Sequence, residues 1–320
     1  MRILVIALIV LVVALCGAIG ATLAFTAPPP PPPMKSVETA FVGADFSAMP
    51  ARSHFTARDG TRLDYRAYPG DPNIDVVLVH GSSGTSASMH FVAQAIHASG
   101  AAVYALAMRG HDGTGRYGDV DYIGQLDDDL VDFLKTLPPK PQGGKRFLLG
   151  FSSGGGFVLR FAGSPNGHLF DRFILVSPQM PARSPLMRPN GGGWVSVSIP
   201  RVIVLSMLDR FGIHAFDGLT AIEFAVAPKD RTVQTASYSW RMLRNFGPTD
   251  DYLGDLKRAP GPVAVLAGQK DEIFFSNRYA ATLKPVRPDV SVTLIPGLGH
   301  MDMTTKPAAL AAIRDAVYGH

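Results

Sequence analysis

Cysteine is nearly absent from this chain of 320 residues, which has only one, Cys16. No intramolecular disulfide can form, and neither a cysteine metal site nor a cysteine nucleophile is credible. Charged residues are also sparse, at 18% of the chain, and the lysines and arginines form no dense block. The net charge of +4 therefore indicates no nucleic-acid partner. Apolar residues make up 47%, enough for a sizeable core in one large domain or two small ones.

The longest stretch without charge lies at the N-terminus, where residues 3–25 carry one hydroxyl side chain, Thr22. About twenty apolar residues cross a bilayer as a helix, whereas the apolar centre of a cleaved signal peptide spans about 7–15 residues. Residues 1–27 are therefore predicted to form an uncleaved transmembrane anchor. The alternative is a signal segment cleaved after residues 18–20 or near Ala27, which would give a secreted or periplasmic protein.

Three further features of the N-terminal region bear on where the protein resides. Arg2 precedes the apolar run and no positive charge follows until Lys35, so the positive-inside rule places the main domain on the extracytoplasmic side. Lipidation of Cys16 is disfavoured, because bulky Leu15 stands where the bacterial lipoprotein pattern requires a small residue. Residues 28–50 form a proline-rich linker, whose six consecutive prolines predict a stiff polyproline II spacer that holds the domain off the membrane.

Strand and helix patterns alternate through residues 51–320. An Asp-Gly pair at residues 59–60, between alternating apolar and polar residues, predicts an opening hairpin. Short apolar runs of the kind buried in parallel sheets then alternate with helical patterns. The predicted strands are 75–79, 101–107, 147–151, 173–176, 263–267 and 290–295, and the predicted helices are 87–98, 122–137, 155–162, 277–283 and 308–318. This order predicts an α/β fold with a mostly parallel central sheet flanked by helices.

The alternation stops at about residues 179–250, which are rich in proline, glycine, methionine and aromatic side chains. A largely apolar run lies within this part, at residues 194–208. We expect an inserted, mainly helical cap over the edge of the sheet. Such a cap would supply an apolar wall to a ligand pocket, since ligands bind beyond the carboxyl ends of parallel strands.

A nucleophile elbow is indicated at residues 145–156. An apolar strand there ends in Gly150-Phe151-Ser152-Ser153-Gly154, and the start of a helix of small residues follows. The Gly-x-Ser-x-Gly pattern forms a sharp strand-to-helix turn that exposes one serine beyond the end of the sheet. Ser152 is the candidate nucleophile. A serine hydroxyl needs a base to accept its proton and a third group to orient that base.

His300 and Asp271 are the candidate base and acid. His300 follows the last predicted strand and Asp271 follows the strand before it, so both can meet Ser152 at one edge of the sheet. Glu272 is the alternative acid, since only one of two adjacent loop residues can orient the histidine. The order serine, acid, histidine is that of α/β hydrolases and differs from the chymotrypsin and subtilisin orders.

Two backbone N–H groups are expected to stabilise the oxyanion of a tetrahedral intermediate, often by about 2.7–4 kcal/mol each. One belongs to Ser153, directly after the nucleophile. The other belongs to Ser82, in the loop His80-Gly81-Ser82-Ser83-Gly84. Because both roles use the main chain, replacing either serine with alanine should do less harm than Ser152→Ala.

No metal, phosphate or other cofactor site is expected. Asp127-Asp128-Asp129 lie early in a predicted helix, where acidic residues suit the helix dipole and a solvated face is the simpler interpretation. Gly154-Gly155-Gly156 lack the Gly-Lys-Ser/Thr of a phosphate-binding loop, and close packing at the elbow explains them.

These motifs together resemble the α/β-hydrolase superfamily, and more narrowly its lysophospholipase and monoacylglycerol lipase branch, which includes proteins labelled serine aminopeptidases. The matching motifs are His80-Gly81, Arg109-Gly110-His111, Gly150-Phe151-Ser152-Ser153-Gly154, Gly268-x-x-Asp271 and Gly299-His300, within about residues 55–318. The resemblance implies a triad of Ser152, Asp271 and His300 and hydrolysis of carboxylic esters through an acyl-enzyme. The chain departs from the family at Asp112, where a further glycine often follows Arg-Gly-His, and its cap matches nothing specific.

The main hypothesis is a membrane-anchored serine hydrolase that cleaves lipid-like esters, such as acylglycerols or lysophospholipids. The apolar cap and the anchor favour a small-molecule substrate of this kind. The alternative is a peptidase, thioesterase or C–C hydrolase with the same triad. A peptidase that removes N-terminal residues would need cap carboxylates such as Asp217 and Glu223 to bind the substrate amine. A non-catalytic binding module is disfavoured because all three triad positions are filled, and Ser152 excludes hydrolases with an aspartate nucleophile.

Overall fold

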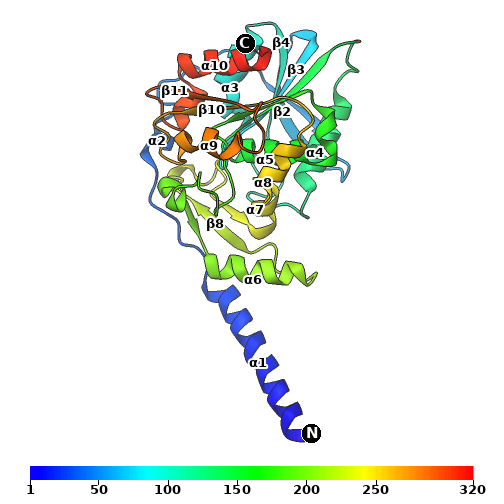
Figure 1. The fold of residues 1–320 in the computed structure, drawn as a ribbon, viewed down its shortest axis with the longest axis vertical. Coiled ribbons are helices and arrows are strands. Elements are labelled where there is room, and N and C mark those ends of the chain that lie inside the picture. The colour runs from blue at the N-terminus through cyan, green and yellow to red at the C-terminus, as the bar shows by residue number, and fades with distance from the viewer. Residues whose placement is uncertain (320) are drawn as a thin grey trace.

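An eight-stranded sheet forms the centre of the molecule in the computed structural model, which describes residues 1–319 (Figure 1). The strands are β1 (Arg52–Thr56), β2 (Arg62–Tyr68), β3 (Asp71–Val79), β4 (Ala101–Leu106), β5 (Lys145–Phe151), β6 (Arg172–Val176), β10 (Val263–Gly268) and β11 (Ser291–Ile295). They lie in the order β1-β2-β4-β3-β5-β6-β10-β11. β2 runs antiparallel to both of its neighbours, and the strands from β4 to β11 are parallel. The mostly parallel sheet predicted from the sequence is confirmed.

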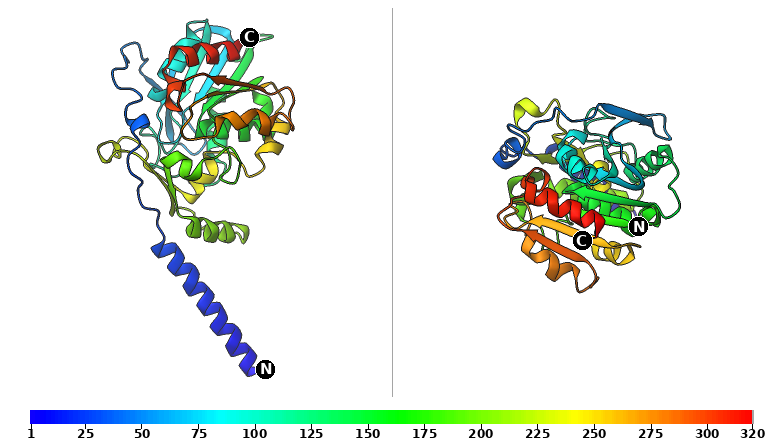
Figure 2. Two further views of the ribbon diagram at one scale, coloured as in Figure 1. Left: turned by 60° about the vertical axis from the view of Figure 1, so that its left-hand side comes forward. Right: turned by 90° about the horizontal axis from the view of Figure 1, so that it is seen from above.

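Helices cover both faces of this sheet (Figure 2). One face packs against α3 (His90–His97) and α10 (Pro307–Tyr318), and the other against α4 (Gln125–Thr136), α5 (Ser153–Gly163), α8 (Tyr252–Arg258) and α9 (Tyr279–Leu283). The sequence of the central strand β3 is continuously apolar because helices cover the strand on both faces. Val76 and Leu78 point into the α3 and α10 layer, whereas Val77 and Val79 point into the opposite layer. All four side chains are fully buried, as a strand covered on both faces requires.

The cap at about residues 179–250 contains strands as well as helices, which the sequence analysis did not anticipate. A small antiparallel sheet has the order β7-β8-β9 and is made of β7 (Val195–Val197), β8 (Thr220–Phe224) and β9 (Ser237–Ser239). The cap helices are α6 (Ile199–Arg210) and α7 (Trp240–Asn245). The apolar run 194–208 is divided at Ser198, whose hydroxyl accepts the N–H of Arg201 and caps α6. Strand β7 precedes this cap and helix α6 follows it.

The three aspartates at 127–129 lie near the start of α4, as predicted, but they do not form a solvated face. Their side chains make ion pairs with arginines from other elements: Asp127 with Arg160, Asp128 with Arg58 and Asp129 with Arg109, at 2.7, 2.6 and 2.8 Å. Asp129 is buried, with 6% of its surface exposed. The expectation of a solvated face is therefore wrong, and these carboxylates join α4 to the sheet edge and to α5.

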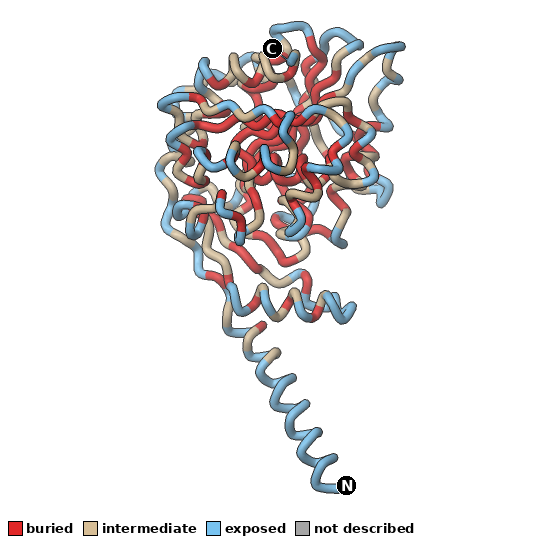
Figure 3. The backbone as a smooth tube through the Cα atoms, viewed as in Figure 1, coloured by how far each residue is buried: buried red, intermediate tan, exposed pale blue. Residues whose placement is uncertain are grey.

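Helix α1 (Arg2–Phe25) projects away from the domain, and nearly all of its length is exposed (Figure 3). It is the one helix within residues 1–319 that is long and apolar enough to cross a membrane. Its last turn, however, contacts the cap. Leu23 is 5% exposed and packs with Leu205 and Leu208 of α6. The linker is therefore not a spacer that holds the domain away from α1.

Residues 26–50 run along the surface of the cap and the domain rather than extending freely. The N–H of Met34 donates to the carbonyl oxygen of Ala225, and the short helix α2 (Lys35–Glu38) follows. Farther along, the ring of Phe46 packs on those of His90 and Phe91 of α3, with centroid distances of 5.6 and 5.2 Å. We call residues 34–46 the strap, because they lie along the domain between α1 and β1.

Candidate active site

The turn after β5 places Ser152 beyond the end of the sheet, with a φ of 56° and a ψ of −119°. Two glycines allow the close approach that this turn requires. A Cβ at Gly150 would lie 2.2 Å from the carbonyl oxygen of Gly154, and a Cβ at Gly154 would lie 2.3 Å from that of His80. The Ser152 N–H donates to the Val176 carbonyl at 2.9 Å and holds the strained residue in place. Strand, turn and helix thus have the arrangement of a nucleophile elbow.

His300 and Asp271 lie beside Ser152 in one chain of hydrogen bonds. His300 Nε2 is 3.1 Å from Ser152 Oγ, and His300 Nδ1 is 2.8 Å from Asp271 Oδ2. The exposed fractions of Ser152, His300 and Asp271 are 6, 2 and 1%. When Nδ1–H donates to the carboxylate, Nε2 has its lone pair directed at the serine hydroxyl and can accept its proton.

The two adjacent carboxylates of the loop after β10 have different partners. Asp271 Oδ1 accepts the N–H groups of Ile273 and Phe274, each at 2.9 Å, while its other oxygen faces the imidazole. Glu272 Oε2 accepts the backbone N–H of His300 at 2.9 Å. The acid next to the imidazole is therefore Asp271, and Glu272 holds the main chain of the same histidine.

The surroundings of Asp271 favour its charged form. Burial raises the pKa of Asp271, but the attraction of His300 and the hydrogen bonds from His300, Phe274 and Ile273 outweigh it, so the pKa lies below the ordinary value. The rings of Phe151 and Phe274 pack on the imidazole at centroid distances of 4.8 and 5.1 Å. These rings restrict the orientation of the imidazole.

The backbone N–H groups of Ser82 and Ser153 lie beside the nucleophile. Ser153 follows it in the chain, and a Cβ on Gly81, next to Ser82, would be 3.1 Å from the Cβ of Ser152. Within residues 1–319 neither N–H donates to a backbone carbonyl. The two hydroxyls are engaged elsewhere. Trp194 Nε1 donates to Ser82 Oγ at 2.9 Å, and Ser153 Oγ donates to the Gln179 side chain at 2.6 Å. The two main-chain donors can therefore serve an oxyanion.

His80 supports the Ser82 loop and does not take part in the hydrogen-bonded chain of Ser152. The N–H of Met108 donates to His80 Nε2 at 3.2 Å, so the proton of the neutral ring lies on Nδ1. That Nδ1–H donates to the Gly81 carbonyl at 2.8 Å and holds the loop against β4. Burial lowers the pKa of His80, which favours the neutral ring that this pattern requires.

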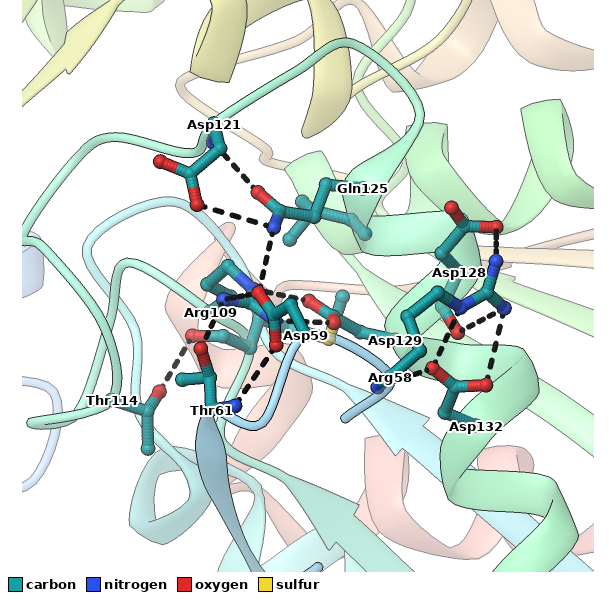
Figure 4. A network of polar contacts seen from close by, with 12 residues as sticks. Arg58, Asp59, Thr61, Arg109, Thr114, Asp121, Gln125, Asp128, Asp129 and Asp132 are labelled. Atoms are coloured by element: carbon teal, nitrogen blue, oxygen red, sulfur yellow. Dashed lines mark hydrogen bonds and ion pairs between the residues drawn. The ribbon is translucent and has the colours of Figure 1, made fainter. Parts of the chain in front are cut away.

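The segment Arg109-Gly110-His111 joins the sheet to the cap. Arg109 Nε and Nη2 each donate to Asp129 at 2.8 Å, and Nη1 lies 2.9 Å from Asp59 of the first hairpin (Figure 4). Burial alone would lower the pKa of Arg109, but the two carboxylates outweigh it and raise the pKa. On the cap side, His111 Nε2 is 2.6 Å from the hydroxyl of Tyr238 in β9. Arg109 and His111 therefore have structural partners.

Asp112, where the related family often has glycine, has a positive φ of 54°. A glycine would adopt this backbone conformation without strain. The aspartate instead provides contacts that glycine lacks. Its Oδ2 accepts the N–H and the hydroxyl of Ser86 at 2.9 and 2.6 Å, and its Oδ1 pairs with Arg52. Ser86 begins the short helix that follows the Ser82 loop, so Asp112 anchors that loop from the far end.

A cavity of about 180 Å³ adjoins Ser152 and His300. Its walls come from the Ser82 loop, the cap, the loops after β10 and β11, and the strap. The lining residues are Val37, Phe41, Phe46, Gly81, Ser82, Ser83, Gly84, Thr85, Ala87, Ser88, Phe151, Ser152, Trp194, Gln234, Ile273, His300, Met301 and Thr304. Within residues 1–319, no aspartate, glutamate, lysine or arginine lines it.

Sequence reasoning missed the contribution of the strap to this cavity. It treated residues 28–50 as a linker, yet Val37, Phe41 and Phe46 line the cavity wall. The available signal was the presence of bulky apolar side chains after the proline run, since exposed linkers are mostly polar. The sequence did predict an apolar cap wall, and Trp194 of the cap lines the cavity.

Two groups considered from the sequence lie outside this cavity. Asp217, with Asp209 and His214, forms the one group of three possible metal ligands found within residues 1–319, and none of them lines the cavity. His214 Nδ1 lies 3.0 Å from Asp217 Oδ2, so a direct contact accounts for their proximity. Glu223 pairs with Arg231 and does not line the cavity either. The structure thus places neither Asp217 nor Glu223 where a substrate amine would lie beside Ser152.

Comparison with known proteins gives matches over most of the domain. The alpha/beta hydrolase family matches residues 76–313. The chain is 32% identical over 166 residues to a monoacylglycerol lipase of Mycolicibacterium smegmatis, a match that covers 49% of this chain and 55% of that protein. The chain thus spans little more than half the length of this curated relative.

Solved structures with a similar fold include two lipases. A soluble variant of monoglyceride lipase from Saccharomyces cerevisiae has a TM-score of 0.62 at 18% identity, covering 85% of this chain and 94% of that one. A monoacylglycerol lipase from Paleococcus ferrophilus has a TM-score of 0.58 at 22% identity, covering 80% and 97%. At these identities the likeness shows the fold alone.

Proposed function

The chain belongs to the alpha/beta hydrolase family, and from this premise we propose that it hydrolyses carboxylic esters with apolar acyl groups. Ser152 is the nucleophile, His300 the general base and Asp271 the acid that orients it. The observation that carries the proposal is the unbroken hydrogen-bonded chain from Ser152 Oγ through the imidazole to Asp271, beside a cavity that no aspartate, glutamate, lysine or arginine of residues 1–319 lines. The 32% identity to a monoacylglycerol lipase also supports it.

The reaction proceeds through an acyl-enzyme. Ser152 Oγ attacks the ester carbonyl carbon while His300 Nε2 takes the serine proton. The N–H groups of Ser82 and Ser153 stabilise the oxyanion, and His300 then gives its proton to the departing alcohol. Water next loses a proton to His300 and attacks the acyl carbon. Collapse of this second intermediate releases the carboxylic acid and returns the proton to Ser152.

The cavity walls favour an uncharged, hydrocarbon acyl group. Phe41, Phe46 and Trp194 present large apolar surfaces, and no acidic or basic side chain other than His300 lines the cavity within the described residues. Burying apolar chain here is favourable by about 0.8 kcal/mol per methylene. We therefore infer a lipid-like substrate such as a monoacylglycerol or lysophospholipid. Glu223 and Asp217, the carboxylates considered for binding a substrate amine, lie outside the cavity, which counts against the peptidase alternative.

We also propose that α1 is a retained anchor, with the domain on the extracytoplasmic side. The helix has 24 residues and is about 36 Å long, enough for a hydrocarbon layer of about 30 Å. Its last turn packs on the cap through Leu23, and Arg201 donates to the Leu23 carbonyl at 2.6 Å. These contacts with the folded domain favour retention over cleavage near Ala27.

The full-length chain, purified in detergent, tests the proposed chemistry with p-nitrophenyl octanoate. Ser152→Ala should lower kcat/KM by about 10⁴–10⁶-fold, because the nucleophile is lost. Ser153→Ala is the matched control and should retain most activity, since its proposed role uses the main chain. Equal loss in both variants, or activity in Ser152→Ala close to that of the wild type, would contradict the assignment.

The lipid-like substrate is tested separately by fatty-acid release from a monoacylglycerol and from a lysophosphatidylcholine. We expect the wild-type chain to release fatty acid from at least one of these lipids, and Ser152→Ala to release none. An enzyme that cleaves p-nitrophenyl acetate but neither lipid would refute the substrate class while leaving the triad standing.

A further inference from the structure

The outer face of α6 is apolar and exposed. Ile199, Ile203, Met207 and Phe211 follow one another at intervals of four residues, so they lie along one side of the helix and its C-cap. Their exposed fractions are 58, 54, 49 and 78%. The opposite side of α6, with Leu205 and Leu208, is buried against the cap. A contiguous apolar patch of this kind marks an interaction site rather than ordinary surface.

The loop after α6 continues the patch. Ile213 and Phe216 are exposed to 43 and 42%. We call these residues together with the outer face of α6 the α6 patch: Ile199, Ile203, Met207, Phe211, Ile213 and Phe216. Arg210 and His214, also exposed, lie between these residues in the chain, but the six large side chains of the α6 patch are apolar and suit an occupant recognised mainly through apolar contact.

The position of the patch is fixed by the end of α1. Arg201, on the buried side of α6, donates to the Leu23 carbonyl at 2.6 Å, and Ser198 donates to Thr26 Oγ1 at 3.2 Å. Leu23 is buried among Leu205 and other cap side chains. The two helices are therefore joined by hydrogen bonds and packing, and Figures 1 and 2 show that α6 begins beside the end of α1 and runs away from it to one side.

We propose that the α6 patch lies in the interfacial layer of the bilayer that holds α1. This inference rests on the proposed anchor role of α1. A helix of about 36 Å ends near the headgroup level when it spans about 30 Å of hydrocarbon, so α6 is held at that level. Apolar side chains on an interfacial helix enter the boundary between headgroups and acyl chains. Ile19 of α1 and Val202 of α6 pack against the same apolar cluster as Leu23, so the apolar surfaces of the two helices adjoin, and we take lipid rather than a soluble partner as the occupant of the α6 patch.

This placement also connects the bilayer to the active site. Trp194 lines the cavity and donates to Ser82, and only β7 and Ser198 separate it from the start of α6. A lipid that leaves the bilayer beside α6 is therefore close to a wall of the cavity. The α6 patch serves to hold the cap at the surface from which the proposed substrate comes.

The test uses the full-length chain in phosphatidylcholine vesicles and one environment-sensitive fluorophore on a single cysteine. The natural Cys16, exposed on α1, is the probe for the anchor. In a Cys16→Ser background, Met207→Cys and Ile203→Cys place probes on the α6 patch. Ser99→Cys is the matched control, because it is exposed beside α3 at the far end of the domain. Quenching is measured with lipids that carry a nitroxide near the headgroup end of the acyl chain or deeper within it.

We expect the shallow nitroxide to quench the probes at positions 203 and 207 several-fold more than the probe at 99, and the deeper nitroxide to quench the probe at Cys16. Quenching at Cys16 with none at 203 and 207 would overturn the α6 proposal while leaving the anchor intact. Disulfide-linked pairs formed by unlabelled Met207→Cys chains, together with no lipid quenching of the labelled chains, would assign the α6 patch to a second copy and also overturn the proposal. Hydrolysis of p-nitrophenyl octanoate, measured on the same samples, reports the proposed chemistry independently.

Discussion

Phe41→Ala should change the acyl-chain preference of the enzyme without changing its chemistry. Phe41 lies on the strap, lines the cavity and packs on Phe46 at a centroid distance of 6.0 Å. A phenyl ring covers about two or three methylenes of a passing chain, each contributing about 0.8 kcal/mol, so its removal should cost about 1.6–2.4 kcal/mol of binding for a long acyl group. That energy corresponds to a loss of about 15–60-fold in kcat/KM. An acetyl group has a single methyl to bury, so it should lose little from this change and should be cleaved nearly as before.

The assay is kcat/KM for p-nitrophenyl esters from acetyl to decanoyl, with full-length protein. Val42→Ala is the control, because Val42 is the next residue, is 78% exposed and does not line the cavity. We expect the decanoyl-to-acetyl ratio to fall in Phe41→Ala and to stay unchanged in Val42→Ala. Equal losses on all esters, or the same ratio in both variants, would refute the assignment of the strap as a cavity wall.

Three further predictions follow from the hydrogen bonds and charges of the site. Asp271→Asn should lower kcat by about 10⁴-fold, because an amide no longer enforces the tautomer of His300 that can accept the serine proton. Glu272→Gln keeps an acceptor for the backbone N–H of His300 and should lose far less activity. Steady-state hydrolysis of an ester distinguishes the two variants. Arg109→Ala should destabilise the fold by about 3–5 kcal/mol, since it leaves a buried carboxylate unpaired, and a urea midpoint equal to wild type would contradict this. Burial lowers the pKa of His80 and that of His111, so below about pH 6.5 the folded state binds fewer protons than the unfolded state. The free energy of unfolding should therefore decrease as the pH falls below that value, by at most about 1.4 kcal/mol per pH unit for each histidine. A free energy of unfolding in urea that stays constant from neutral to acidic pH would refute this prediction.

The sequence predicted the sheet because each pattern in it reflects a structural requirement of the residues that carry that pattern. The continuous apolar run of β3 is required by burial on both faces, and the glycines at 150 and 154 are required by the close approach at the elbow. The choice between Asp271 and Glu272 was different. The pattern left both open, and the turn after β10 decides it by directing one carboxylate to the imidazole and the other to a backbone N–H.

The parts that the sequence did not predict depend on contacts between distant segments. Phe41 and Phe46 look like linker residues until the strap packs beside the Ser82 loop and α3. Asp129 looks like a helix-start carboxylate until Arg109, twenty residues away in the chain, pairs with it. The cap sheet was missed because its strands are short, and β7 and α6 share one nearly continuous apolar run that contains no periodicity change strong enough to divide it.

The most direct test of the central claim is to map the covalent adduct that a fluorophosphonate forms with the full-length chain. The serine with a hydrogen-bonded imidazole should react, because the base increases its nucleophilicity. We predict one adduct, found by peptide mass spectrometry on the fragment that contains Ser152. It should be absent in Ser152→Ala and retained in Glu272→Gln. A chain that hydrolyses esters but carries the adduct on another residue, or carries none, would contradict the account.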